Sequence, residues 1–142
     1  MMRIGHRLVA AAVTLSCAHH IDHVLRGGEA VGWPLTSSIN AFTYSLAVYP
    51  VIATMAFLSR RGRTGPRAWL LLSAAGAVFV LAVHAGPAAG DAIADIADAY
   101  TSPVAGILAV AVLVAFIAVL ALTAVYEARL TRRTGPTSSG RK

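Results

Sequence analysis

The chain has 142 residues, of which 57% are hydrophobic and only 13% are charged. Soluble domains are about 45–50% apolar and about 25% charged, so this composition excludes an ordinary water-soluble domain and predicts folding in a lipid bilayer. The net charge of +6 does not indicate a nucleic-acid partner, because the basic residues stand in short runs between apolar segments. Such runs are typical of cytoplasmic loops that face anionic lipid.

The first apolar segment, residues 4–25, is long enough to cross a bilayer core of about 30 Å as an α-helix. Its beginning also fits a secretory signal peptide, because Arg3 and Arg7 precede a short apolar stretch that ends in small residues around Cys17. Cleavage there is the alternative to a membrane span. Cys17 is the single cysteine, which excludes an internal disulfide, and its place in an apolar run predicts a small buried side chain.

The rest of the chain contains three more apolar segments of membrane-spanning length. They cover residues 38–59, 67–85 and 103–128. Pro50 lies inside the first of them and is expected to kink its axis, since a proline removes one backbone hydrogen bond and membrane helices tolerate the loss. Ser102 and Pro103 provide a favourable N-cap and first residue for the last helix.

A shorter pattern lies between the last two spans, in residues 88–102. Asp91, Asp95 and Asp98 stand at positions i, i+4 and i+7, and apolar residues occupy another face at similar spacing. This pattern predicts a short amphipathic helix on the surface, with its three aspartates in water.

The loop charges predict the topology. Eleven of the twelve basic residues lie in the N-terminus, the 60–67 loop or the C-terminal tail. Arginine and lysine mark the cytoplasmic side, so both termini are expected there. The sequence therefore predicts an all-α domain over residues 1–130, with four transmembrane helices in an antiparallel bundle. A basic, flexible cytoplasmic tail follows over 131–142. The strong preference for arginine over lysine and the many alanines suggest a bacterial cytoplasmic membrane.

The densest ionisable cluster in an apolar stretch lies at the outer end of the first span. It comprises His19, His20, Asp22, His23 and Arg26. Burying such groups without partners is costly, so they are expected to face the bundle interior and not lipid.

Polar residues of two other spans lie at the same depth as this cluster. His84 is near the outer end of the third span, and Asn40 and Tyr44 are in the outer half of the second. These residues and the first-span cluster are expected to line one polar chamber in the outer half of the bundle. The inner half carries almost no ionisable residue.

The histidine spacing favours a metal ion or haem in this chamber. His19 and His23 are four residues apart, so both imidazoles project from one helix face, and His84 could add a third nitrogen. Asp22 could ligate the metal or orient a histidine. His20 is an alternative partner, and a histidine from each of two helices could hold a haem axially. Ligand identity alone does not separate zinc, copper and haem.

Two other classes of function remain open. A structural or partner-binding protein would need no cofactor: Asp22 and Arg26 would form a surface ion pair, and residues 103–128 could pack against a second copy or another membrane protein. A small proton-linked carrier would use the histidines and Asp22 as a relay. No nucleophile motif points to hydrolytic catalysis, so an enzyme is not expected.

Overall fold

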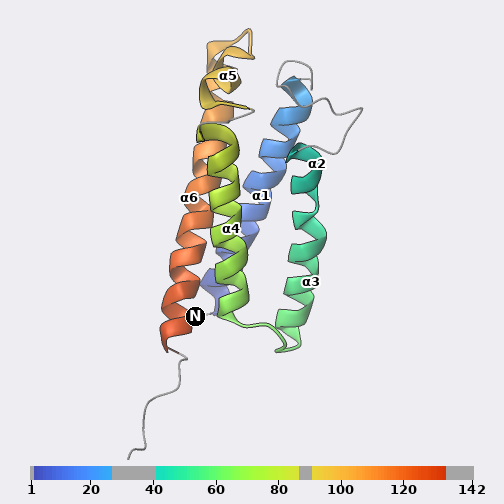
Figure 1. The fold of residues 1–142 in the computed structure, drawn as a ribbon, viewed down its shortest axis with the longest axis vertical. Helices are drawn as coiled ribbons and strands as arrows, with labels where there is room; N and C mark the ends of the chain where they lie inside the picture. Colours follow the sequence, from blue (N-terminus) through green and yellow to red (C-terminus); the bar gives the residue numbers. More distant parts are fainter. Residues whose placement is uncertain (1, 27–40, 87–90, 134–142) are drawn as a thin grey trace, which may run out of the picture.

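The computed structural model describes residues 2–26, 41–86 and 91–133, and within these ranges it contains helices and connections but no strand. The helices are α1 (Met2–Arg26), α2 (Ala41–Leu46), α3 (Val48–Arg60), α4 (Pro66–Ala85), α5 (Ile93–Asp98) and α6 (Pro103–Arg133). The long helices lie lengthwise beside one another (Figure 1). The N-terminus and the basic α3–α4 connection lie at the same end of the molecule (Figure 1).

Four helical segments are long and apolar enough to cross a membrane. They are Ile4–Arg26, Phe42–Arg60, Pro66–Ala85 and Pro103–Arg133. Their number and order confirm the four predicted spans. The last helix continues to Arg133, beyond the predicted end at residue 128. Residues 38–40 at the start of the second predicted span, and 134–142 of the predicted tail, lie outside the described residues.

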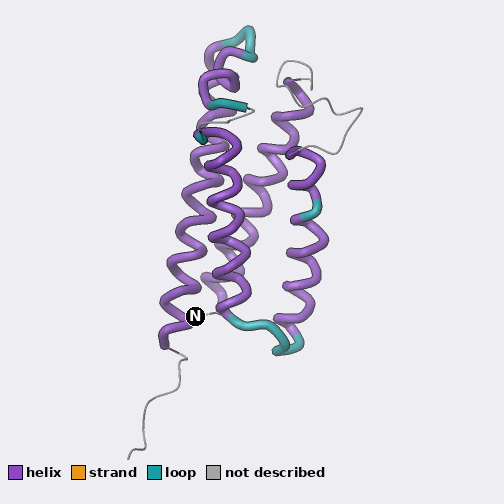
Figure 2. The backbone as a smooth tube through the Cα atoms, in the orientation of Figure 1, coloured by secondary structure: helices purple, strands orange, loops and turns teal. Residues whose placement is uncertain are grey.

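The second span is broken into α2 and α3 at Ala47 (Figure 2). Pro50 has no backbone N–H and cannot donate to Leu46, four residues earlier. The Ala47 N–H donates to the carbonyl of Tyr44 at 3.1 Å, which closes a tighter turn at the break. The expected proline effect is therefore an interruption of the helix, and it changes which side chains the two halves present to the interior.

The hydrophobic core is centred on α6, against which α1, α4 and α5 pack. Leu113 is fully buried at its centre, and Ala12 of α1 and Ala77 of α4 let these helices approach closely. In contrast, α3 carries no buried residue. Burial within the bundle thus concentrates on the three helices α1, α4 and α6.

The helix α5 does not lie freely on the surface as the 88–102 pattern predicts. Ile96 is fully buried in the core, and α5 packs against the beginning of α6. Asp95 and Asp98 are exposed as expected, whereas Asp91 is fully buried. The acidic stripe is therefore divided, with its first member turned into the bundle.

Gly106 allows the close approach of α5 to α6. A Cβ at this position would collide with the backbone carbonyl of Ala97. We expect Gly106→Ala to destabilise the fold by about 1–3 kcal/mol, since the backbone contact leaves no room for a methyl group. Unfolding of the purified protein in detergent measures this, with Gly76→Ala as the control because its added Cβ would meet Leu120 at an ordinary 3.6 Å. Equal stability of the two variants would contradict the packing described here.

Candidate metal centre

Three buried imidazoles from two helices converge at one end of the bundle. The Nε2 atom of His19 lies 3.1 Å from Nε2 of His84 and 3.2 Å from Nε2 of His23. All three residues are at most 7% exposed. One ligand atom from each lies within 4.8 Å of those from the other two. We call these residues the histidine trio.

The two helices place the trio for simple geometric reasons. Residues four apart on α1 project from the same face, which brings the His19 and His23 rings to a centroid separation of 4.6 Å. His84 lies in the last turn of α4, and its ring centroid is 4.9 Å from that of His19. The three rings meet edge to face or tilted, so their nitrogens can point at one shared position.

The separation of the nitrogens is suited to a tetrahedral metal ion. Zinc binds imidazole nitrogen at about 2.0–2.1 Å, which places two tetrahedral ligands about 3.3–3.4 Å apart. The Nε2 atom of His19 lies 3.1 Å from that of His84 and 3.2 Å from that of His23, which is close to this value.

Hydrogen bonds within the trio do not satisfy all of its nitrogens. Nδ1 of His84 donates to the backbone carbonyl of Asp91 at 2.6 Å, so in a neutral His84 the other ring nitrogen, Nε2, carries a lone pair and no hydrogen. Nε2 of His19 contacts two imidazole nitrogens but carries at most one hydrogen, and Nδ1 of His19 is buried with no hydrogen-bond partner. A cation at the shared position would instead accept all three Nε2 lone pairs.

An ion cluster lies directly beside the trio. Arg26 Nη1 and Nη2 donate to the two carboxylate oxygens of Asp91 at 2.7 and 2.9 Å, and Arg26 Nε donates to Asp22 Oδ2 at 2.9 Å. The side chains of Arg26 and Asp91 are fully buried. The expected surface pair of Asp22 and Arg26 is therefore a buried three-member cluster, and the sequence interpretation of Asp91 as a solvated residue is wrong.

Asp91 connects the ion cluster to the trio. Its Oδ2 lies 3.4 Å from Nδ1 of His84 and 3.6 Å from Nδ1 of His23, which is also 3.3 Å from Arg26 Nη2. Metal-binding histidines commonly direct their second nitrogen at a carboxylate or a carbonyl, which fixes the tautomer and the ring orientation. Asp91 offers both groups, although the sequence pattern gave it no role at the site.

Asp22 is not among the convergent ligand atoms. Its Oδ2 accepts from Arg26, and its Oδ1 accepts a 2.6 Å hydrogen bond from the hydroxyl of Tyr100. Both carboxylate oxygens are thus engaged. In this structure Asp22 holds Arg26, which in turn holds Asp91.

Tyr100 makes stability sensitive to alkaline pH. Burial and the hydrogen bond to the Asp22 carboxylate raise the pKa of Tyr100 to about 12, above about 10 for an unperturbed tyrosine. The raised pKa means that the neutral phenol is favoured by folding, so its contribution is present below pH 10 and is lost as pH rises toward 12.

We expect Tyr100→Phe to lower stability at pH 8 and to flatten its decline between pH 10 and 12. Unfolding measured across this range in detergent, as a difference from the unsubstituted chain, tests it. Tyr44→Phe is the control because Tyr44 is 66% exposed. An identical pH profile for the Tyr100→Phe variant would contradict the assigned hydrogen bond.

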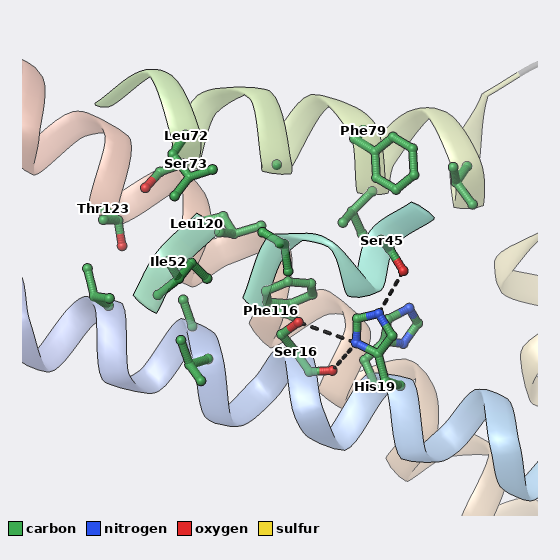
Figure 3. A pocket seen from close by; sticks show the side chains of 18 of the residues that line it. Ser16, His19, Ser45, Ile52, Leu72, Ser73, Phe79, Phe116, Leu120 and Thr123 are labelled. Carbon is green, nitrogen blue, oxygen red and sulfur yellow. Dashed lines mark hydrogen bonds between the residues drawn. The ribbon is translucent and has the colours of Figure 1, made fainter. Parts of the chain in front are cut away.

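His20 belongs to a separate hydrogen-bond network. Its Nδ1 lies 2.7 Å from the Ser16 carbonyl and 2.9 Å from the Tyr49 hydroxyl, and its Nε2 lies 2.7 Å from the Ser45 hydroxyl. The dashed lines from Ser16 and Ser45 in Figure 3 mark two of the hydrogen bonds in this network. His20 is therefore placed apart from the trio.

Of three other residues singled out in the sequence, Tyr44 and Cys17 receive an outcome here. Tyr44, expected in the polar chamber, points outward and is 66% exposed, while Ser45 and Tyr49 take part in the His20 network. Asn40 lies outside the described residues. Cys17 is exposed and not buried, because it lies on the side of α1 away from the trio.

A largely apolar cavity of about 130 Å³ adjoins the trio. Its wall includes all three trio residues, Phe116 of α6 and Trp69 of α4. Figure 3 shows side chains of several helices directed into this space. The cavity brings an apolar chamber into contact with the candidate metal position.

A second cavity lies toward the opposite end of the bundle. It has a volume of about 560 Å³, and Val9 and Trp69 line both cavities. Glu127 lines the second cavity and is only 5% exposed. The half of the bundle away from the trio therefore contains a buried carboxylate, in addition to apolar residues.

Comparisons with protein-family models, with curated proteins and with solved structures gave no match to the chain.

Proposed function

We propose that the chain is an integral membrane protein that binds one transition-metal ion of the zinc class through His19, His23 and His84. The convergence of three buried imidazole nitrogens at 3.1 and 3.2 Å carries this proposal. Three neutral imidazoles, two of them four residues apart on one helix, match the nitrogen ligation that zinc takes in proteins.

The charges around the trio support a cation. Arg26 contributes one positive charge, and Asp22 and Asp91 each contribute one negative charge, so this buried cluster has a net charge of −1. A negative cluster next to neutral imidazoles lowers the cost of placing a divalent ion in a low-dielectric interior. A divalent ion in turn offsets this negative charge and leaves the site with a net charge of +1.

The arrangement favours a bare ion over haem. An axial bis-histidine haem needs a porphyrin plane between the two nitrogens, whereas Nε2 of His19 and Nε2 of His84 are in direct contact at 3.1 Å. A metal ion needs only the shared position itself.

The proposed setting is a bacterial cytoplasmic membrane, with four antiparallel spans and both termini in the cytoplasm. The basic residues of the 60–67 loop and of both chain ends support this orientation by the positive-inside rule. The trio would then lie in the half of the bilayer farther from the cytoplasm.

Zinc titration of the detergent-purified full chain, against a competing chelator, tests the proposal. We expect one zinc ion per chain, with affinity that falls as the pH is lowered because protons compete for the imidazole nitrogens. Binding below half an equivalent at saturation would contradict it. The trio would then be a structural cluster that joins α1 to α4 without a metal.

A further inference from the structure

The cavity of about 560 Å³ lies at the end of the bundle that carries the α3–α4 connection. Its wall is formed by the first part of α1, the end of α3, the start of α4 and the last turns of α6. Small-molecule sites in proteins occupy about 300–1,000 Å³, so this cavity has the size of a drug-sized organic ligand. No residue of the histidine trio lines it.

Glu127 places an unpaired carboxylate at this cavity. The residue is 5% exposed and lines the cavity wall. Within the part of the chain that the structure describes, no group hydrogen-bonds to this carboxylate and no basic side chain forms an ion pair with it. His6 and Arg133 also line the cavity, but both are exposed. A buried carboxylate without a partner is costly, so this position favours a cation supplied by the cavity.

Two aromatic side chains, those of Trp69 and Tyr126, line the same cavity. A Cβ at Gly5 would lie 3.1 Å from Glu127 Oε1 and 3.2 Å from Tyr126 Cε1, so the carboxylate and the phenol ring are neighbours in this wall. Cations are attracted to the faces of tryptophan and tyrosine rings, which also bury apolar groups. A carboxylate beside aromatic rings is therefore suited to a cation with an organic body.

The other polar groups of the cavity offer little to a metal ion or to a donor-rich ammonium. The Ser59 hydroxyl accepts a hydrogen bond from the Trp69 indole at 3.0 Å and is bonded to the Thr64 hydroxyl at 2.6 Å. Glu127 and His6 are at most two metal ligands, whereas protein zinc sites use three or four. Among the described residues, the trio is the one group that brings three such ligands together.

We propose that this cavity binds a monovalent organic cation of diffuse charge, of the quaternary ammonium or phosphonium class. The charge of the ligand lies at Glu127, and its apolar groups lie against Trp69 and Tyr126. The single carboxylate sets the charge of the ligand at +1, and the cavity volume sets its size. This second site is independent of the proposed metal centre.

Equilibrium dialysis of radiolabelled tetraphenylphosphonium against the full chain in an uncharged detergent tests this inference. EDTA keeps the metal centre empty during the measurement. We expect about one phosphonium ion per chain and, after subtraction of binding to empty micelles, affinity for tetraphenylborate that is lower by about tenfold or more, because this ion has the same shape and the opposite charge. Saturating zinc, added without EDTA, should not displace the phosphonium ion.

Glu127→Gln is the matched variant, because it keeps the size of the side chain and removes its charge. We expect it to lower the affinity for tetraphenylphosphonium by about tenfold or more. Asp98→Asn is the control, since it removes a carboxylate that is exposed, and it should leave the affinity unchanged.

The outcomes separate this inference from the proposed metal centre. Equal binding of the phosphonium and borate ions, or an unchanged affinity in Glu127→Gln, overturns the organic-cation site. Displacement by zinc assigns the cavity to a metal ion and overturns it as well. A chain that binds tetraphenylphosphonium as expected but takes up no zinc overturns the metal centre alone. The phosphonium–borate comparison needs no variant, so it decides the matter even if Glu127→Gln does not fold.

Discussion

The double substitution His19→Ala/His84→Ala is expected to lower zinc affinity by more than about 100-fold, because it removes two of the three nitrogens that converge at 3.1 Å. Zinc titration of the purified variant measures this loss. Saturating zinc at 100 times the dissociation constant should also stabilise the unsubstituted chain by about 2.7 kcal/mol and leave the variant unchanged.

His20→Ala is the matched control for this prediction. His20 lies next to His19 in the sequence but bonds to Ser16, Ser45 and Tyr49, outside the trio. Its zinc affinity should stay within about threefold of the unsubstituted chain. Equal losses in the control and the double variant would mean that zinc binds elsewhere.

Arg26→Ala should be the most destabilising single substitution at the site, costing about 3–5 kcal/mol. It leaves the carboxylates of Asp22 and Asp91 without the guanidinium that now pairs with both, and an uncompensated buried charge is expensive. Unfolding in detergent measures the cost. Arg67→Ala is the control, since Arg67 is exposed, and it should change stability by less than about 0.5 kcal/mol.

A triple variant refines the test of the ion cluster. Replacing Arg26 by Met, and Asp22 and Asp91 by Leu, removes all three charges together and should recover most of the stability lost in Arg26→Ala. The triple variant should nevertheless bind zinc more weakly than the unsubstituted chain does, because the net negative charge beside the trio is gone. A triple variant as unstable as Arg26→Ala would show that packing, and not charge, dominates at this site.

The sequence predicted the spans and part of the site for physical reasons that act locally. Length and composition alone define a membrane helix, so four spans could be predicted. Helical periodicity places His19 and His23 on one face, and depth in the membrane brings His84 to their level. The same periodicity contained an unused signal for Cys17, which lies about 200° from His19 around the helix and so faces away from the trio.

The rest of the site depends on contacts between segments that are distant in the sequence. Asp91 shares a spacing with Asp95 and Asp98, and this local pattern does not reveal that α5 folds back against α6 and buries its first aspartate. One hint was available in the sequence: the guanidinium of Arg26 has five N–H donors and can pair with a second carboxylate besides Asp22.

The interruption of the second span explains another missed residue. The helix is interrupted near Ala47, so residues before and after the break do not follow one continuous helical repeat. A prediction that assumed one regular helix over residues 38–59 therefore could not show that Tyr44 faces outward while Tyr49 bonds to His20. Predicting this required the geometry of the break.

X-ray absorption at the zinc edge of the zinc-loaded, detergent-purified chain tests the metal centre most directly. The predicted result is a four-coordinate ion with three imidazole nitrogens and one oxygen at about 2.0–2.2 Å, and loss of the imidazole signal in His19→Ala/His84→Ala. A shell with fewer than two imidazoles, or one unchanged by the double substitution, would contradict the assignment of His19, His23 and His84 as ligands.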